Sequence, residues 1–136
     1  MDSQIAQDGY TYYDFKIINT SSRSAINIQA HLVLATQHNV EGGPIYKTLG
    51  IDFTKNDFFE LGPMSSRDAD AYYALRFTTI ADLDKLWSAE TSHLRLRIMA
   101  TDAESGFSRV FMHDFRVKRN AIKTGLHEFG TSLQVT

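Results

Sequence analysis

The chain has 136 residues, no cysteine and a formal net charge of −2. This length suits one domain with a proper core. The absence of cysteine excludes a disulfide framework and cysteine-based zinc sites. The net charge is close to zero, so the chain lacks the excess of basic residues that is typical of nucleic-acid-binding proteins. No apolar run is close to the length of about 18 residues that a membrane-spanning helix needs. The N-terminal stretch MDSQIAQDGY lacks the basic and apolar regions of a signal peptide.

Most of the chain shows the pattern of short strands separated by turns. Residues 1–8 are expected to be a disordered tail or a remnant of cloning, and residues 9–136 a single domain. Period-2 alternation and turn clusters predict strands over the following residues. These are 10–18, 25–35, 45–53, 58–61 and 70–78.

A single short helix is expected near residue 80. Thr79-Ile-Ala-Asp82 is a weak capping box, and apolar residues at helical spacing follow it at Ile80, Leu83, Leu86 and Trp87. The helix is therefore predicted over residues 80–87.

Residues 94–129 form the longest ordered pattern. Leu94, Leu96 and Ile98 alternate with arginines, the cluster TDAESG is a tight acidic turn, and a second alternating strand ends near Phe115 before a third begins. Roughly seven or eight strands and one short helix predict an all-β fold, an immunoglobulin-like antiparallel β-sandwich whose two sheets bury their apolar faces against each other.

Residue patterns that carry chemistry are scarce. The five histidines lack the spacing of a helical zinc site, and no serine has a nucleophile-elbow context. Glu41-Gly42-Gly43 lacks the lysine and helix of a phosphate loop, so it is interpreted as a hairpin turn. Asp102 and Glu104 form a carboxylate pair that lies in a turn. The chain is therefore not expected to be an enzyme, and no cofactor or metal is expected.

Basic residues cluster toward the C-terminus. They are Arg109, Arg116, Lys118, Arg119 and Lys123, against the single acid Asp114. A solvated strand edge is the first interpretation, because lysine and arginine discourage edge-to-edge pairing. Contact with anionic lipid or with an acidic neighbouring subunit is the alternative.

Several segments, spread over about residues 8–135, resemble the cytoplasmic domain of inward-rectifier potassium channels of the prokaryotic type. In the first half the matching segments are Asp8-Gly9, Phe15-Lys16-Ile17-Ile18-Asn19, Ala30-His31, the Glu41-Gly42 hairpin with the LGIDF strand, and residues 59–64. In the second half they are the helix at IADLDKLW, the strand and loop LRLRIMATDAESG, and the closing positions Phe115, Ile122, Gly125 and Phe129. The chain departs from the family at Leu32-Val33, where a basic residue is usual, and at Thr124, where tryptophan is usual.

The resemblance implies a homotetramer on the cytoplasmic face of a membrane, with potassium ions passing along the central axis. The pore-constriction loop would consist of Thr101, Asp102, Ala103, Glu104, Ser105 and Gly106, with Asp102 and Glu104 attracting cations. Anionic lipid headgroups are possible partners, nucleic acid is not, and Tyr12, Tyr72 and Tyr73 are candidate interface residues. The membrane helices and selectivity filter are absent from this sequence, so the chain is expected to be a soluble excised domain or a free-standing relative.

Two other classes compete with the channel interpretation. The first is a free-standing β-sandwich that binds other proteins. The second is a small lipid- or sugar-binding enzyme domain, which would need a concave pocket with convergent polar groups.

Overall fold

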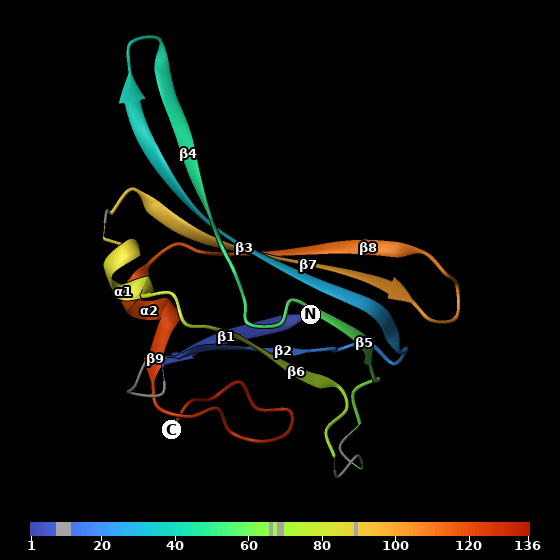
Figure 1. The fold of residues 1–136 in the computed structure, drawn as a ribbon. Coiled ribbons are helices and arrows are strands. Elements are labelled where there is room, and N and C mark those ends of the chain that lie inside the picture. The colour runs from blue at the N-terminus through green and yellow to red at the C-terminus, as the bar shows by residue number, and fades with distance from the viewer. Residues whose placement is uncertain (8–11, 66, 68–69, 89) are drawn as a thin grey trace.

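The computed structural model describes residues 1–7, 12–65, 67, 70–88 and 90–136. Asp8-Gly9 and the start of the strand predicted from residue 10 lie outside these ranges. The described chain is a sandwich of two sheets (Figure 1), so the all-β prediction is confirmed. The first sheet has the order β6 (Ala74–Thr79), β2 (Tyr13–Ile18), β1 (Asp2–Gln7) and β9 (Ile122–Thr124). The second has the order β4 (Gly43–Ile51), β3 (Ala25–Val40), β7 (Ser92–Asp102) and β8 (Ser108–Phe115), with β5 (Asp57–Leu61) also paired to β3.

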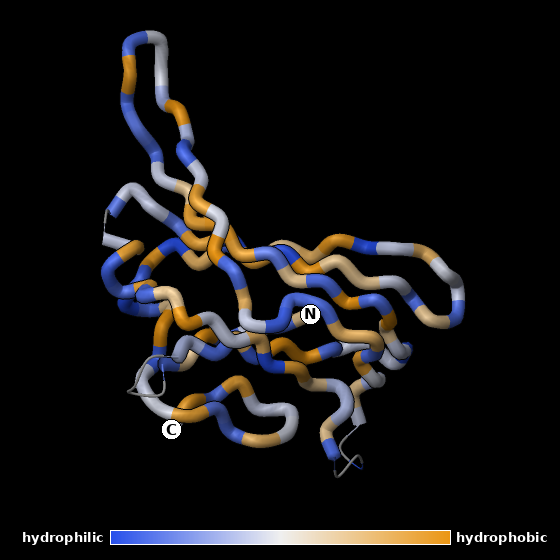
Figure 2. The backbone as a smooth tube through the Cα atoms, viewed as in Figure 1, coloured by the Kyte–Doolittle hydropathy of each residue, from blue (hydrophilic) through white to orange (hydrophobic). Residues whose placement is uncertain are grey.

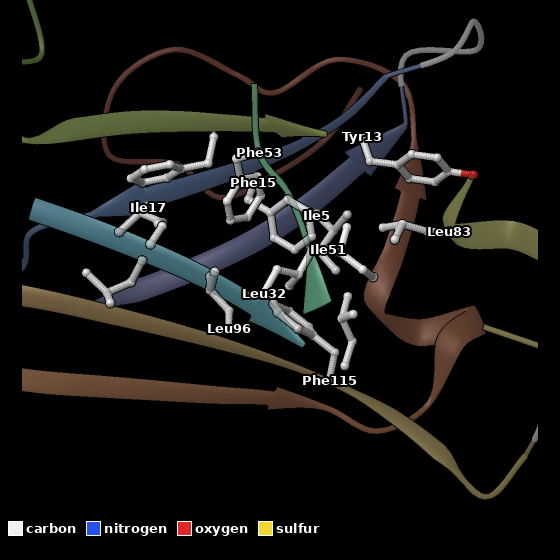
Figure 3. Close-up of a cluster of buried hydrophobic side chains, with 14 of the residues drawn as sticks. Ile5, Tyr13, Phe15, Ile17, Leu32, Ile51, Phe53, Leu83, Leu96 and Phe115 are labelled. Atoms are coloured by element: carbon white, nitrogen blue, oxygen red, sulfur yellow. The ribbon is translucent and has the colours of Figure 1, made fainter. Parts of the chain in front are cut away.

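The core lies between the two sheets, and both contribute large apolar side chains to it (Figure 3). From the first sheet come Ile5, Phe15, Ile17 and Phe77, and from the second Leu32, Leu94, Leu96 and Phe115. The alternation that predicted β7 is confirmed, because its leucines and Ile98 are buried while Arg95 and Arg97 are exposed. Each such side chain stabilises the fold by about 1.5–3 kcal/mol through burial.

The N-terminal residues are not the disordered tail that the sequence predicted. Residues 2–7 form β1, which pairs antiparallel with β2 and parallel with β9. The stretch has one large apolar residue, Ile5, so its sequence gives no alternating pattern. Partners on both edges satisfy the backbone hydrogen bonds of β1, and Ile5 is fully buried, so tertiary context decides the conformation here.

The predicted helix is shorter than expected and begins later. α1 spans Leu83–Leu86, and the side chain of Asp82, not Thr79, caps it by accepting a hydrogen bond from the Lys85 amide. The Thr79 hydroxyl donates to the carbonyl of Asp52 instead. A second four-residue helix, α2 (Lys118–Ala121), was not predicted.

A bulge in β3 changes which residues face the core. Asn27 has a φ of 51°, and the register with β7 shifts between Ile26 and Gln29. As a result Ala25 and Ile28 are both buried while Ile26 is only partly covered. A strict period-2 pattern would place Ile26 and Ile28 on the same face, and the bulge prevents this.

β3 and β4 extend beyond the sandwich as an arm, here defined as residues 36–49, which is two-stranded beyond the pairing of Thr36 with Ser92 on β7. The expected loop after residue 35 is instead a continuation of β3, which pairs with β4 as far as Val40 and Gly43 around the two-residue turn Glu41-Gly42. Figure 1 shows the arm rising away from the body, and Figure 2 shows apolar stretches along it. In β4 every residue before Ile51 is exposed.

Candidate functional site

The acidic turn between β7 and β8 is held in one conformation by its own hydrogen bonds. The Asp102 Oδ1 atom accepts the backbone N–H groups of Glu104 and Ser105, each at 2.9 Å. The Gly106 N–H donates to the Asp102 carbonyl at 2.9 Å, and the φ of Gly106 is 75°, a conformation that glycine adopts without strain. The two N–H bonds hold the pKa of the Asp102 carboxyl below its usual value, and nearby Arg23 contributes less.

Arg23 lies beside both carboxylates of this turn. Its guanidinium is 3.6 Å from Asp102 Oδ2 and 3.4 Å from Glu104 Oε2. The turn is also tied to the residues before β3, because the Ala103 N–H donates to the Ser24 carbonyl at 3.1 Å. The sequence did not reveal Arg23, although the pairing of Ala25 with Asp102 places it next to the turn once the β3–β7 register is known. Asp102, Glu104 and Arg23 together carry a net charge of −1, and Arg109 is a second base nearby.

The six residues of the predicted constriction loop lie together at the tip of the β7–β8 hairpin. Thr101 and Asp102 end β7 and are partly covered, and the four residues from Ala103 to Gly106 are exposed. Thr101 is 3.0 Å from Ser108 between the hydroxyl oxygens, which closes the base of the turn. The loop is therefore a rigid, solvent-facing acidic turn.

The five basic residues predicted as lipid or interface contacts do not form one surface. Arg109 is the second residue of β8 and lies near the acidic turn, whereas Arg116 follows the other end of that strand. A strand rises about 3.3 Å per residue, which separates these two backbone positions by roughly 23 Å. Lys123 is on β9, in the other sheet. One ligand therefore cannot contact all five.

Three of the five basic residues do line one cavity. The cavity has a volume of about 470 Å³ and is bordered by Trp87, Ser88, Glu90, Ser92 and residues 116–119. Arg116 pairs with Asp114 at 3.2 Å, and the Lys118 Nζ atom pairs with Asp84 at 2.7 Å. Asp114 also pairs with Arg95 at 2.8 Å, and Glu90 adds an acid to the lining, so Arg119 is the one of these three cations without an ion pair among the described residues.

The three tyrosines predicted as interface residues have different environments. Tyr12 and Tyr72 are exposed, but Tyr73 is buried against Ile18 on the outer side of the first sheet. The prediction is wrong for Tyr73, because the residues after β9 fold over this side and Leu133 packs on the same cluster.

Residues 125–136, here called the C-terminal segment, are fastened to the first sheet by a buried lysine. The Lys16 Nζ atom donates to the carbonyls of Glu128, Gly130 and Ser132 at 2.6, 2.8 and 2.6 Å. Gly125 begins the segment with a φ of 132°, and a Cβ atom there would lie 2.5 Å from the Thr136 carbonyl oxygen. The alternation of residues in β2 does not indicate that Lys16 fastens the C-terminal segment, because it places Lys16 on the outward face of the strand like any exposed lysine.

His127 adds a pH-sensitive contact to the same segment. Its Nε2 atom is 2.8 Å from the Asp14 carbonyl oxygen, so Nε2 carries the hydrogen. Nδ1 is buried and has no hydrogen-bond partner among the described residues. Burial lowers the pKa of His127, and the charges of Arg76 and Lys16 lower it further, against the raising effects of the Asp14 hydrogen bond and charge.

Acid is expected to destabilise the fold through His127. Its folded-state pKa is depressed, so the free energy of unfolding is highest above the ordinary value of 6.5 and falls as the pH drops through the folded-state pKa. Urea unfolding between about pH 8 and pH 5 would measure this. His127→Gln keeps an N–H donor and does not titrate, so the variant should lose part of the pH dependence. His93, whose pKa burial also lowers, accounts for a remainder common to both proteins. Identical pH profiles for parent and variant would contradict the assignment.

Comparison with known proteins finds no family model that matches the chain and no similar curated protein. Within the described ranges, no helix is long and apolar enough to cross a membrane. The described histidines and carboxylates form no group of three or more that could hold a metal ion.

Proposed function

We propose that the chain is the cytoplasmic pore and gating domain of a tetrameric, inward-rectifier-type potassium channel. The observation that supports this most is the β7–β8 turn, a rigid and exposed hairpin tip with a net charge of −1. Its carboxylates would act through their electrostatic field on passing ions and would take part in no reaction. Four copies around an axis would present about four negative charges to ions that are still partly hydrated, and would raise the local cation concentration.

Gating in this proposal is a rigid-body movement of the domains against one another. The two-sheet core gives each domain the stiffness that such movement needs, and subunit interfaces switch between discrete packings. The cavity lined by Arg116, Lys118 and Arg119 is where an anionic lipid headgroup would contact the domain, with Arg119 as the unpaired cation.

The proposal is tested on the full-length product of the parent gene. Its coding sequence should contain two apolar runs of about 20 residues flanking a filter of the Thr-x-Gly-Tyr-Gly type. Reconstituted into planar bilayers, that product should carry a potassium-selective current. Absence of such a current would rule the channel function out.

Neutralising the turn is expected to lower the single-channel conductance. Glu104→Gln changes the net charge of each turn from −1 to zero and leaves the hydrogen bonds of Asp102 intact. The conductance should fall about twofold at low ionic strength, and the difference should vanish in concentrated salt, where the charges are screened. Glu60→Gln, on β5, is the matched control and should conduct like the parent. If Glu104→Gln and the parent have equal conductance at low salt, the turn does not lie on the ion path.

A β-sandwich that binds other proteins is the second candidate function. The arm favours it, because a two-stranded hairpin exposed along most of its length is marginally stable by itself and gains from a partner.

A further inference from the structure

The C-terminal segment is a closed unit that rests on the outer side of the first sheet. Leu126 and Thr136, near its two ends, each donate their N–H group to the carbonyl of the other at 2.9 Å. The segment is joined to β1 at its start, where the Gly125 N–H donates to the Gln7 carbonyl at 2.8 Å. In Figure 1 it forms a separate loop below β2 and β6. Because its ends are bonded to each other, the segment can move as one piece about Gly125.

Polar contacts attach this unit to the sandwich more than apolar burial does. Leu126 and Phe129, two large apolar side chains of the segment, are 62% and 70% exposed, whereas Leu133 packs on the sheet. The polar contacts are the three hydrogen bonds of the Lys16 ammonium group and the bond from His127 to β2. An attachment of this kind is sensitive to a change of charge.

His127 is the residue of the segment where such a change costs most. Its Nε2–H group already donates to the Asp14 carbonyl, and its Nδ1 atom is buried with no hydrogen-bond partner among the described residues. A proton on Nδ1 would therefore create a buried N–H donor without an acceptor, on a ring that has become charged. The attached position accommodates the neutral ring and disfavours the charged one.

The surrounding charges do not supply the missing acceptor. The charged side chains around the contact are Asp14 and Lys16 of β2, Asp70 before β6, Arg76 of β6 and Glu128 of the segment itself. Arg76 and Lys16 oppose a positive charge on the ring, and Asp14 favours it. The Asp14 carboxylate accepts the Thr78 hydroxyl at 2.6 Å. No described carboxylate forms a hydrogen bond with Nδ1.

The segment covers an apolar patch of the first sheet. Ile18, Ala71 and Tyr73 are buried together there, and Leu133 of the segment packs on them. Lys16 and Ala71 border one cavity with Phe129. Displacing the segment therefore uncovers apolar side chains next to the ammonium group of Lys16.

We propose that the C-terminal segment is an acid-released latch: protonation of His127 at Nδ1 detaches the segment from the first sheet while the sandwich stays folded. The described core cluster between the sheets includes no residue of the segment, so the sandwich keeps its own packing when the segment leaves. Burial lowers the pKa of His127, so release occurs below the ordinary value of 6.5. The inference goes beyond the channel function and does not depend on it, because every contact in it lies within one chain.

Amide hydrogen exchange in low urea tests whether the release is local. After correction for intrinsic exchange rates, the protection of the Leu126 and Thr136 N–H groups should fall up to about tenfold between about pH 7.5 and pH 5.5, because the open form binds one more proton below pH 6.5. This exchange should be nearly independent of urea, because local opening exposes little surface, whereas exchange in β7 should rise with urea. Equal urea dependence of the segment and β7 would mean that acid unfolds the whole chain and would overturn the inference.

Replacement of the titrating ring tests the assignment to His127. His127→Gln keeps an N–H donor and does not titrate, so protection of the segment should no longer change with pH. His38→Gln is the matched control, because His38 is exposed on the arm, and it should behave like the parent. A fall in protection as large in His127→Gln as in the parent would refute the assignment.

A thiol placed under the segment measures the uncovering directly, because the chain has no cysteine of its own. Ala71→Cys should react with dithiodipyridine up to about tenfold faster at pH 5.5 than at pH 7.5, relative to Ala103→Cys on the exposed β7–β8 turn. Adding His127→Gln to Ala71→Cys should remove this acceleration. A ratio of the two rates that stays constant with pH would show that acid uncovers nothing, and the latch would be ruled out.

Discussion

Lys16→Met is expected to release the C-terminal segment from the first sheet and to lower the free energy of unfolding by about 2–4 kcal/mol. Methionine is close to lysine in length and apolar content, so the change removes the ammonium group while it keeps most of the packing. Three carbonyls, of Glu128, Gly130 and Ser132, then lose their shared donor.

The large effect follows from burial. Lys16 is only 2% exposed, and burial is the main cause that lowers its pKa, with the charge of Arg76 adding to it. The ammonium group is nevertheless favourable where it is, because each of its three N–H bonds meets a carbonyl oxygen. Without it the carbonyls either stay unpaired or separate to admit water, and both outcomes cost stability. Relief from burying a charge offsets part of this cost, which is why the expected loss is less than three full hydrogen bonds.

Two measurements check the result. Urea unfolding gives the stability loss, and amide hydrogen exchange shows whether protection disappears locally, at Leu126, Glu128 and Thr136, whose N–H groups bond within the segment. Lys123→Met is the control, because Lys123 is exposed on β9. Full protection of the segment in Lys16→Met would mean that other contacts hold it.

The strands that periodicity predicted are those whose two faces differ. Leu94, Leu96 and Ile98 point into the core while the arginines between them face water, and the alternation of apolar and charged residues in the local sequence shows this difference. β1 lacks such a pattern, because its place between β2 and β9 comes from distant segments and not from its own residues. The burial of Lys16 could not be predicted for the same reason, since the segment that buries it lies more than a hundred residues further along the chain.

The position of the β7–β8 turn was predictable from its residues, but the net charge around it was not. The turn from Thr101 to Gly106 lies at a hairpin tip because its composition specifies a turn. Arg23, which cancels one of its two carboxylates, is brought there by the pairing of β3 with β7, and pairing partners are not encoded in local alternation. For the same reason Arg109 and Arg116, close in the sequence, are at opposite ends of β8.

Phe15→Ala is expected to have the largest effect on stability, about 3–5 kcal/mol. Phe15 is fully buried on β2, and its ring packs edge-to-face against Phe53 at 5.3 Å and Phe115 at 6.2 Å between centroids. Figure 3 shows it between the two sheets. Removing the ring loses its burial and both aromatic contacts, and leaves a cavity where the sheets meet.

The size of the loss depends on how far the sheets can close over that cavity. Backbone pairing on both sides of Phe15, to Ile5 on β1 and to Phe77 on β6, fixes its position and limits the collapse. Phe15→Leu fills most of the space, so it should lose only about 1–2 kcal/mol. The exposed Phe59→Ala should change stability by less than about 0.5 kcal/mol. Urea unfolding with an unchanged denaturant slope would show that these differences come from the folded state. A loss for Phe15→Ala no larger than for Phe15→Leu would mean that the two sheets repack freely, a flexibility at odds with the rigid-body movement on which the proposed gating depends.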